Sequence, residues 1–565
     1  MRKETAYIFD FDPARTLIIF DEFANNLSPE TSDGKGTGDN HKDNIRRLLN
    51  FFPVLGEDEE GCMVELDAAQ VLSIPRRLKS QEVVRHGFMS NFLFQNISNV
   101  FGAPGIVKEI VGKLTPAHED QKKRDQKNFQ NISDVPVDEN GEVDIPNEII
   151  IGKAQGIFKK KLYEDMVESF EPQISHIAES HEYTAVKQSM KKLADTVKEK
   201  VSQEVVAPVA DAYEIKKNVH KRIEHQVESE IDRKFEQIHG DYIQQANIAK
   251  AEFERKQKTA ETPKEVMAAE EAYKTSMDDA LRALTEAAQN IVQDTVQSKP
   301  AELVAQMEKH KAEAEKKSVE DSVRAHLRGF SRTIPSFIMA YGDGHLTLQN
   351  FDKYTEADVF KEVSGITIDD FRFLRDGGEY NNPETGVIEH FSGHLFDETV
   401  FNDSVEEFWK KKQTLADYFN EIQTEDIFDY IPPQKTNQIF TPRWVVEKMV
   451  DELEENNPGC FDDPSKTFAD LYMKSGLYIT EIVKRLFRSD KMKQQFPNDK
   501  IRIQHILKNQ VYGMAPTRII YLIATNYILG FDEKMKVETT HFVQADAAQA
   551  AKDGTLPQLV EKYFH

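Results

Sequence analysis

Residues 468–482, FADLYMKSGLYITEI, have the residue types of a cofactor-binding turn. The sequence predicts a buried strand that ends at Asp470 and a helix that begins after Ser475 and Gly476. A strand, a turn of small residues and a helix present backbone N–H groups to a nucleotide-like ligand. Such turns prefer glycine, because the backbone must approach the ligand closely, and Lys474 stands where the first glycine is expected.

A helix is predicted just before this strand, in the segment TNQIFTPRWVVEKMVDEL (436–453). Thr441 is suited to capping the helix, and Pro442 suits its first position. The apolar residues at helical spacing predict one buried stripe, which consists of Val445, Val446, Met449, Val450 and Leu453.

Two further strands are predicted after the turn. QVYGM (510–514) is a short strand, and the helix after it is expected to be capped by Thr517 and to end at Gly530. HFVQAD (541–546) is another short strand and ends at the acidic residue Asp546. Helices and strands therefore alternate, which predicts an open parallel sheet.

The order of elements over about 436–550 resembles the N-terminal half of the catalytic domain of adenine-N6 DNA methyltransferases in large restriction–modification polypeptides. In that family a Phe-Thr-Pro segment closes over S-adenosylmethionine, and Phe440, Thr441 and Pro442 match it. The resemblance implies a Rossmann-like sheet that binds S-adenosylmethionine, and DNA as the partner.

The family's Asp-Pro-X-X-Gly-Ser-Gly turn holds the methionine part of the cofactor. Asp470, Ser475 and Gly476 match this turn, whereas Leu471 replaces the proline and Lys474 replaces the first glycine. Two interpretations of the lysine stay open. Its ammonium group pairs with the cofactor carboxylate, or the turn has lost a glycine that needed positive φ and no longer binds the cofactor.

The later strands match the family in part. Gly513 matches, but Ala515 stands where the family has an acid for the cofactor ribose, and Asp546 fits the acid near the adenine ring. The catalytic (Asn/Asp/Ser)-Pro-Pro-(Tyr/Phe) loop, which holds the flipped base, is not found. The Pro-Pro of YIPPQ (430–434) follows Ile431 and precedes the cofactor segment, so no catalytic residue is assigned.

The rest of the chain resembles other parts of single-chain restriction enzymes. AYIFDFDPARTLIIFDEFA (6–24) resembles the tail of a RecA-like helicase core beyond its ATPase motifs, so ATP and Mg²⁺ are expected only in a complete parent enzyme. The expected fold is mixed α/β and α. Its parts are a helicase-like remnant (1–112), a linker with a small Asn-Gly hairpin (113–150), long helices (151–328), a globular coupler (329–435) and an incomplete methyltransferase domain (436–565).

The region 151–328 is rich in Ala, Glu, Lys and Gln, which predicts long helices in a spacer or antiparallel bundle. Pro172, Pro208, Pro263 and Pro300 are expected to separate these helices.

Composition limits the partners and the location. The net charge of −25 argues against a surface that binds nucleic acid everywhere, although a local basic patch remains compatible with it. Cys62 and Cys460 have no CxxC partners, so we expect neither a disulfide framework nor a metal site, and a cytoplasmic location fits best. No membrane contact is expected.

Two other functions stay open. The chain is a complete subunit whose partner chain supplies the catalytic loop and target recognition, or it is a non-catalytic scaffold that binds DNA or protein.

Overall fold

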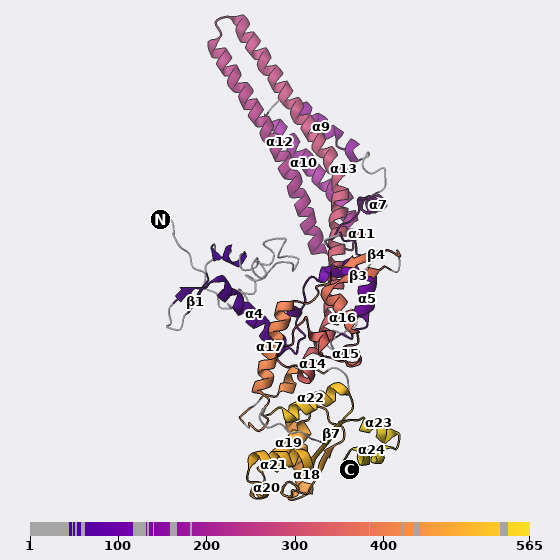
Figure 1. Cartoon of the computed structure of the whole chain (residues 1–565). Coiled ribbons are helices and arrows are strands. Elements are labelled where there is room, and N and C mark those ends of the chain that lie inside the picture. Colours follow the sequence, from indigo (N-terminus) through magenta and orange to yellow (C-terminus); the bar gives the residue numbers. More distant parts are fainter. Residues whose placement is uncertain are drawn as a thin grey trace. The chain divides into compact units, whose positions relative to one another are not determined.

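The structure, a computed structural model, describes residues 44–47, 49–50, 54–57, 63–116, 132, 135–138, 141–158, 166–180, 183–382, 385–420, 422–423, 425–433, 440–531 and 541–564. The strands expected in the first 43 residues lie outside the described residues. The described part is mostly helical, with small sheets, and the chain divides into two compact units (Figure 1). The first unit comprises Met1–Asp134 and Lys317–His565, and the second Val135–Lys316. Within the described ranges, no helix has the length and apolarity that crossing a bilayer requires.

The second unit is built from helices, as the composition predicts. Its elements are α7 (Asn147–Ile157), α9 (Glu171–Ala178), α10 (Tyr183–Val201), the π-helical turn η5 (Ser202–Val206), α11 (Ala207–Ala212), α12 (Lys217–Thr259) and α13 (Pro263–Ser331) as far as Lys316. Val137 and Val143 pair as an antiparallel bridge around Gly141, so the described part of the predicted hairpin is present.

Helices α12 and α13 run side by side in opposite directions (Figure 1), joined by a short connection. Lys234 Nζ lies 3.0 Å from Asp294 Oδ2, and the buried Lys299 bridges Glu230 at 2.7 Å and Glu302 at 2.8 Å. Beneath these ion pairs lies a continuous apolar core, which includes Leu193, Val197, Ile231, Ala288, Val292 and Val296.

The predicted role of the prolines is confirmed at two of the four positions. Pro172 lies in the first turn of α9, and Pro263 begins α13. Pro208 was expected to separate two helices, but α10, η5 and α11 form one unbroken helical run, and Pro208 lies just after its π-helical turn. Pro300 was expected to end a helix, but it lies inside α13. The neighbouring core residues Val296, Leu303 and Val304 are all buried, and this packing offsets the hydrogen bond that proline removes.

In the first unit, the segments before and after the long helices share one core. The described N-terminal elements are the antiparallel strands β1 (Leu55–Glu57) and β2 (Met63–Glu65), helix α4 (Ala68–Arg85), the 3₁₀ turns η1 (Asn91–Leu93) and η2 (Ile97–Gly102), and α5 (Pro104–Gly112). Helix α4 packs against α17 (Glu398–Thr414). Gln95 N donates to Leu395 O at 3.1 Å, and Asp397 N donates to Leu93 O at 2.9 Å.

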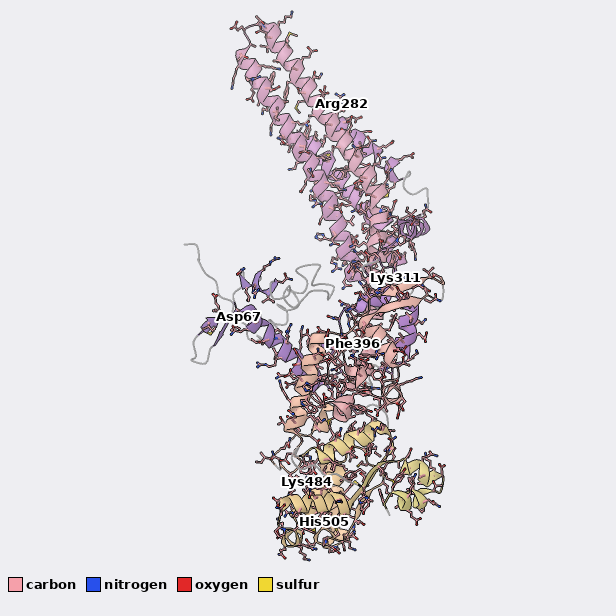
Figure 2. All side chains as sticks on the ribbon, in the orientation of Figure 1. Asp67, Arg282, Lys311, Phe396, Lys484 and His505 are labelled. Atoms are coloured by element: carbon pink, nitrogen blue, oxygen red, sulfur yellow. The ribbon has the colours of Figure 1, made fainter. Side chains whose placement is uncertain are left out.

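A cluster of phenylalanine rings forms the centre of this core. Phe330, in the last turn of α13, lies 5.3 Å from Phe371 and 5.7 Å from Phe396 between ring centroids. Phe337 lies 5.3 Å from Phe351 and 5.6 Å from Phe360. Phe396, labelled in Figure 2, belongs to the loop before α17. The rings come from α13, α14 (Ile334–Tyr341), η6 (Phe351–Lys353), α15 (Ala357–Ser364), α16 (Ile368–Asp376) and that loop.

Beside the phenylalanine cluster, a buried ion pair and a hairpin complete the coupler region. Asp352 accepts hydrogen bonds from Arg372 Nε at 2.7 Å and Arg375 Nη1 at 2.9 Å. Burial opposes ionisation of Asp352, but the two arginines outweigh it and lower its pKa. The antiparallel strands β3 (Gly378–Asn381) and β4 (Ile388–Phe391) follow α16.

The C-terminal region contains the predicted parallel sheet, with strand order β5-β6-β7. Asp470 on β5 is level with Gly513 on β6, which is level with Phe542 on β7. The region comprises α18 (Arg443–Asn456), β5 (Phe468–Asp470), α19 (Leu477–Arg488), α20 (Asp490–Gln495), α21 (Asp499–His505), the π-helical turn η10 (Ile506–Gln510), β6 (Val511–Ala515), α22 (Arg518–Leu529), β7 (His541–Gln544), α23 (Ala547–Lys552) and α24 (Leu556–Phe564).

Phe330→Ala should lower the free energy of unfolding of the first unit by about 3–5 kcal/mol, because it empties the centre of the ring cluster. Both tryptophans of the chain, Trp409 and Trp444, belong to the first unit, so tryptophan fluorescence during denaturation reports on it. Ile422→Ala is the control, since that side chain is 90% exposed. Equal effects of the two substitutions would contradict the central role of Phe330.

Candidate functional site

The turn between β5 and α19 is held by its own backbone and by β6. Asp470 Oδ1 accepts a hydrogen bond from Tyr472 N at 3.0 Å, and Met473 N donates to Met514 O at 2.8 Å. The buried hydroxyl of Ser475 accepts a hydrogen bond from Leu477 N at 3.3 Å. The sequence-predicted residues Asp470, Lys474, Ser475 and Gly476 therefore lie together at the carboxyl end of β5.

The half-buried carboxyl group of Asp470 is an unusual feature of this turn. Burial raises its pKa, and the hydrogen bond from Tyr472 N opposes this only in part. Among the described residues, none forms an ion pair with Asp470. Ligands of open parallel sheets bind at the carboxyl ends of the strands. The carboxyl group of Asp470 has this position, which makes it a candidate site residue.

Lys474 fits the turn without a glycine conformation. The described residues with positive φ include Gly476 (85°) but not Lys474. Lys474 Nζ lies 5.8 Å from the centroid of the Tyr472 ring, which is itself 38% exposed. The lysine therefore causes no backbone strain here, which removes the physical basis for reading it as a lost glycine at this position.

Gly476 serves packing between helices. A Cβ atom there would lie 2.9 Å from Ile528 Cγ1 and 3.3 Å from Ala524 O, both in α22. The left-handed conformation before α19 also requires glycine. The expected close approach to a ligand is therefore replaced, at this residue, by a close approach to α22.

The other strands contribute less than the family pattern implies. Ala515, at the end of β6, is fully buried and supplies no acid. Thr517 precedes α22, but its hydroxyl makes no capping hydrogen bond, contrary to expectation. Asp546 is exposed and accepts a hydrogen bond from Gln549 N at 2.9 Å, so it caps α23. Gly530 ends α22 as predicted.

The Phe-Thr-Pro segment lies beside α22. The ring of Phe440 is tilted by 52° against that of Phe428, with 4.9 Å between centroids, and Phe428 lies 4.9 Å from Tyr527 of α22. Helix α18 begins at Arg443, so Pro442 occupies the capping position rather than the first helical position. This one-residue difference arises because Pro442 has extended ψ (144°) and Thr441 makes no capping hydrogen bond.

Arg443 and Asp426 join this segment to the core, a contact that sequence reasoning missed. Arg443 Nε donates to Asp426 Oδ2 at 3.2 Å. Burial raises the pKa of Asp426, and the charge of Arg443 opposes the rise. The two residues are 17 positions apart with a Pro-Pro between them, so no periodic pattern in the sequence could have paired them.

A small cavity lies between α18, α19 and α22. Its volume is about 10 Å³, which is room for one water molecule. Arg443, Leu477, Glu481 and Tyr527 are among its lining residues. This cavity is too small for a nucleotide-like cofactor.

The apolar stripe predicted on α18 is only partly buried. Val446 and Val450 are buried, whereas Met449 and Leu453 are 51% and 36% exposed. Trp444 is 69% exposed at the start of the same helix. Met449 contacts Tyr478 of α19, with 2.8 Å between Sδ and the hydroxyl oxygen. Met449 of α18 therefore reaches the first turn of α19.

Comparisons with known proteins found no matching family model, no similar curated protein and no similar solved structure.

Gly476→Ala should lower the free energy of unfolding by about 2–4 kcal/mol, because alanine is strained at positive φ and its Cβ would lie too close to Ile528. Gly459→Ala is a matched control, because Gly459 also has positive φ (77°) but no atom lies within 4 Å of its Cβ position. Denaturation followed by tryptophan fluorescence measures both.

The contact itself is tested by adding Ile528→Ala, which removes the Cγ1 and Cδ1 atoms that would lie 2.9 Å and 3.0 Å from the new Cβ. The second substitution should cost less in the Gly476→Ala background than alone. Equal losses for Gly476→Ala and Gly459→Ala, with additive behaviour of Ile528→Ala, would show that packing against α22 is not the constraint.

Proposed function

We propose that residues 436–565 form the cofactor-binding half of an S-adenosylmethionine-dependent adenine-N6 DNA methyltransferase within a restriction–modification polypeptide. The observation that carries the proposal is the turn between a parallel strand that ends at Asp470 and helix α19, where the half-buried carboxyl group of Asp470 lies at the carboxyl end of the strand. The progression β5-β6-β7, with α19 and α22 as connecting helices, supports it, because one half of a doubly wound sheet has this order.

The residues fit the methionine end of S-adenosylmethionine better than its ribose. Lys474 offers an ammonium group for the cofactor carboxylate, and Asp470 offers a carboxylate at the same edge. The buried Ala515 offers no ribose contact, and Asp546 lies two residues beyond β7, on the adenine side that the family pattern assigns to it. When bound, the cofactor supplies a methyl group on a sulfonium centre.

The base-binding half is not provided by the Pro-Pro of residues 432 and 433. A Cβ at Gly87 would lie 2.6 Å from Pro432 Cδ, so this proline packs tightly against the loop after α4. Holding a flipped adenine beside the sulfonium needs a polar side chain and an aromatic ring in another loop. In this proposal, that loop and target recognition come from a second subunit or from a further part of the polypeptide.

The remaining regions have proposed roles in the same system. Residues 1–112 are a RecA-like helicase remnant, 329–435 couple it to the methyltransferase, and ATP and Mg²⁺ act only in a complete parent enzyme. A non-catalytic scaffold is the second candidate, and the buried Ala515 favours it, because the ribose acid is missing.

Asp470→Asn should weaken S-adenosylmethionine binding at least about tenfold, or roughly 1.4 kcal/mol, in calorimetry with the whole chain. Asparagine keeps the acceptor for Tyr472 N, so the turn is retained. Asp463→Asn is the matched control, since Asp463 likewise accepts a hydrogen bond from the N–H group two residues on, Ser465, at 2.9 Å.

The same variant should be at least as stable as the wild type at pH 7. Because burial raises the pKa of folded Asp470 above its unfolded value, its ionised form costs stability at neutral pH, and that cost disappears as pH falls through the raised pKa. Asparagine removes the charge and this part of the pH dependence. Loss of stability together with unchanged cofactor binding would assign Asp470 a structural role and overturn the proposed site.

Gly476→Val is not a suitable test of the site. It would disturb the contact with Ile528, so loss of binding in that variant would not separate a ligand contact from a packing defect.

A further inference from the structure

The hydroxyl group of Tyr527, in α22, is buried in the first unit without a protein partner. The residue is 4% exposed. No side chain or backbone group of the described residues forms a hydrogen bond with its hydroxyl oxygen, which is itself inaccessible to solvent. Buried polar groups nearly always bind protein or an internal water molecule, because an unpaired one destabilises the fold.

The charged groups near Tyr527 do not satisfy its hydroxyl. Burial and the negative charge of Asp426 raise the pKa of Tyr527. Arg443 is close enough to oppose this rise, but its guanidinium group makes no hydrogen bond of acceptable length and angle with the hydroxyl. The hydroxyl group is therefore protonated at neutral pH and can both donate and accept a hydrogen bond.

Tyr527 lines the cavity between α18, α19 and α22, whose volume of about 10 Å³ fits one water molecule. An internal water needs about two to four polar partners. Besides Tyr527, the cavity is lined by Arg443 of α18 and by the buried Thr480 and Glu481 of α19. Lys484, labelled in Figure 2, lines the same cavity. The site is thus polar as well as large enough.

These lining groups offer both donors and acceptors. Thr480 already donates its hydroxyl hydrogen within α19, so its oxygen can accept another hydrogen bond. Glu481 has a carboxylate with several lone pairs. Arg443 donates its Nε–H to Asp426 at 3.2 Å, and a guanidinium group has four further N–H donors. A water molecule can therefore donate to α19 and accept from Arg443 or Tyr527.

We propose that this cavity is a binding site for one water molecule, which completes the hydrogen bonding of Tyr527 and joins α18 to α19 and α22. The link matters most for α18, whose apolar contact is small, since its buried residues are Val446 and Val450. Arg443 directly follows the Phe440–Pro442 segment, so the same water helps to position that segment. The inference rests on the cavity and on Tyr527, and it holds whether or not the chain binds S-adenosylmethionine.

The first test is Tyr527→Phe in the whole chain, followed by urea denaturation with tryptophan fluorescence. Phenylalanine removes one partner of the bound water, so the folding equilibrium constant should fall about fivefold. A hydroxyl group that truly has no partner would behave in the opposite way, because its removal stabilises the fold. A constant equal to or above that of the wild type would therefore overturn the proposal.

Tyr521→Phe is the matched control, because Tyr521 lies on the same helix but does not line the cavity. Its folding equilibrium constant should equal that of the wild type. A loss as large as that of Tyr527→Phe would show that the effect does not come from the cavity.

The second test fills the site from α18. Val446→Ile adds a methylene group to a residue that lines the cavity, which should expel the water and leave the Tyr527 hydroxyl unpaired. The folding equilibrium constant should fall about tenfold in the wild-type background but only about twofold in the Tyr527→Phe background, where no hydroxyl remains. Strain from the larger side chain is common to both backgrounds and cancels. Equal effects in the two backgrounds would contradict the water site.

The water molecule itself is detected by magnetic relaxation dispersion of the water oxygen nucleus, which counts internal waters with long residence times. The wild type and Tyr521→Phe should each hold one more such water than Val446→Ile. Equal counts in the wild type and Val446→Ile would overturn the proposal, even if the stabilities change as expected.

Discussion

Helix α22 positions the candidate turn, because it is held on two sides. Asn526 Nδ2 donates to Ala340 O of α14 at 2.8 Å, and the hydroxyl of Tyr418 donates to Ile528 O at 3.1 Å. On the other side, the Ile528 side chain fills the space that the absent Cβ of Gly476 leaves. The candidate turn is therefore positioned by contacts that reach into the phenylalanine-rich core as well as by its own sheet.

This dependence follows from the small size of the sheet. The strand β5 has three residues and β7 has four, and so few ladder hydrogen bonds do not hold a sheet in water without packing. Helix α14, almost entirely buried between this layer and the phenylalanine cluster, supplies the apolar surface. We infer that residues 329–435 act as structural support for the candidate site, since α22 has no comparable partner within the described part of 436–565.

Features that depend on short-range sequence patterns were predicted correctly, whereas features that depend on contacts between residues distant in the sequence were missed. Alternating strand and helix signals after residue 440 correctly predicted the parallel sheet, because each element carries its own turn or glycine signal. The function of Gly476 in packing, the pairing of Arg443 with Asp426 and the course of α13 through Pro300 depend on residues distant in sequence. The shared core of residues 88–114 and 330–408 was missed for the same reason.

The partners of three carboxyl groups distinguish residues that stabilise the fold from a candidate site residue. Asp352 is almost fully buried and has two arginine partners, which lower its pKa, so its charge is part of the support. Asp426 is also buried and pairs with Arg443. Asp470 differs from both, because its hydrogen-bond donor is the backbone N–H group of Tyr472 and burial raises its pKa. Of these three carboxyl groups, Asp470 is therefore the one without an arginine partner among the described residues.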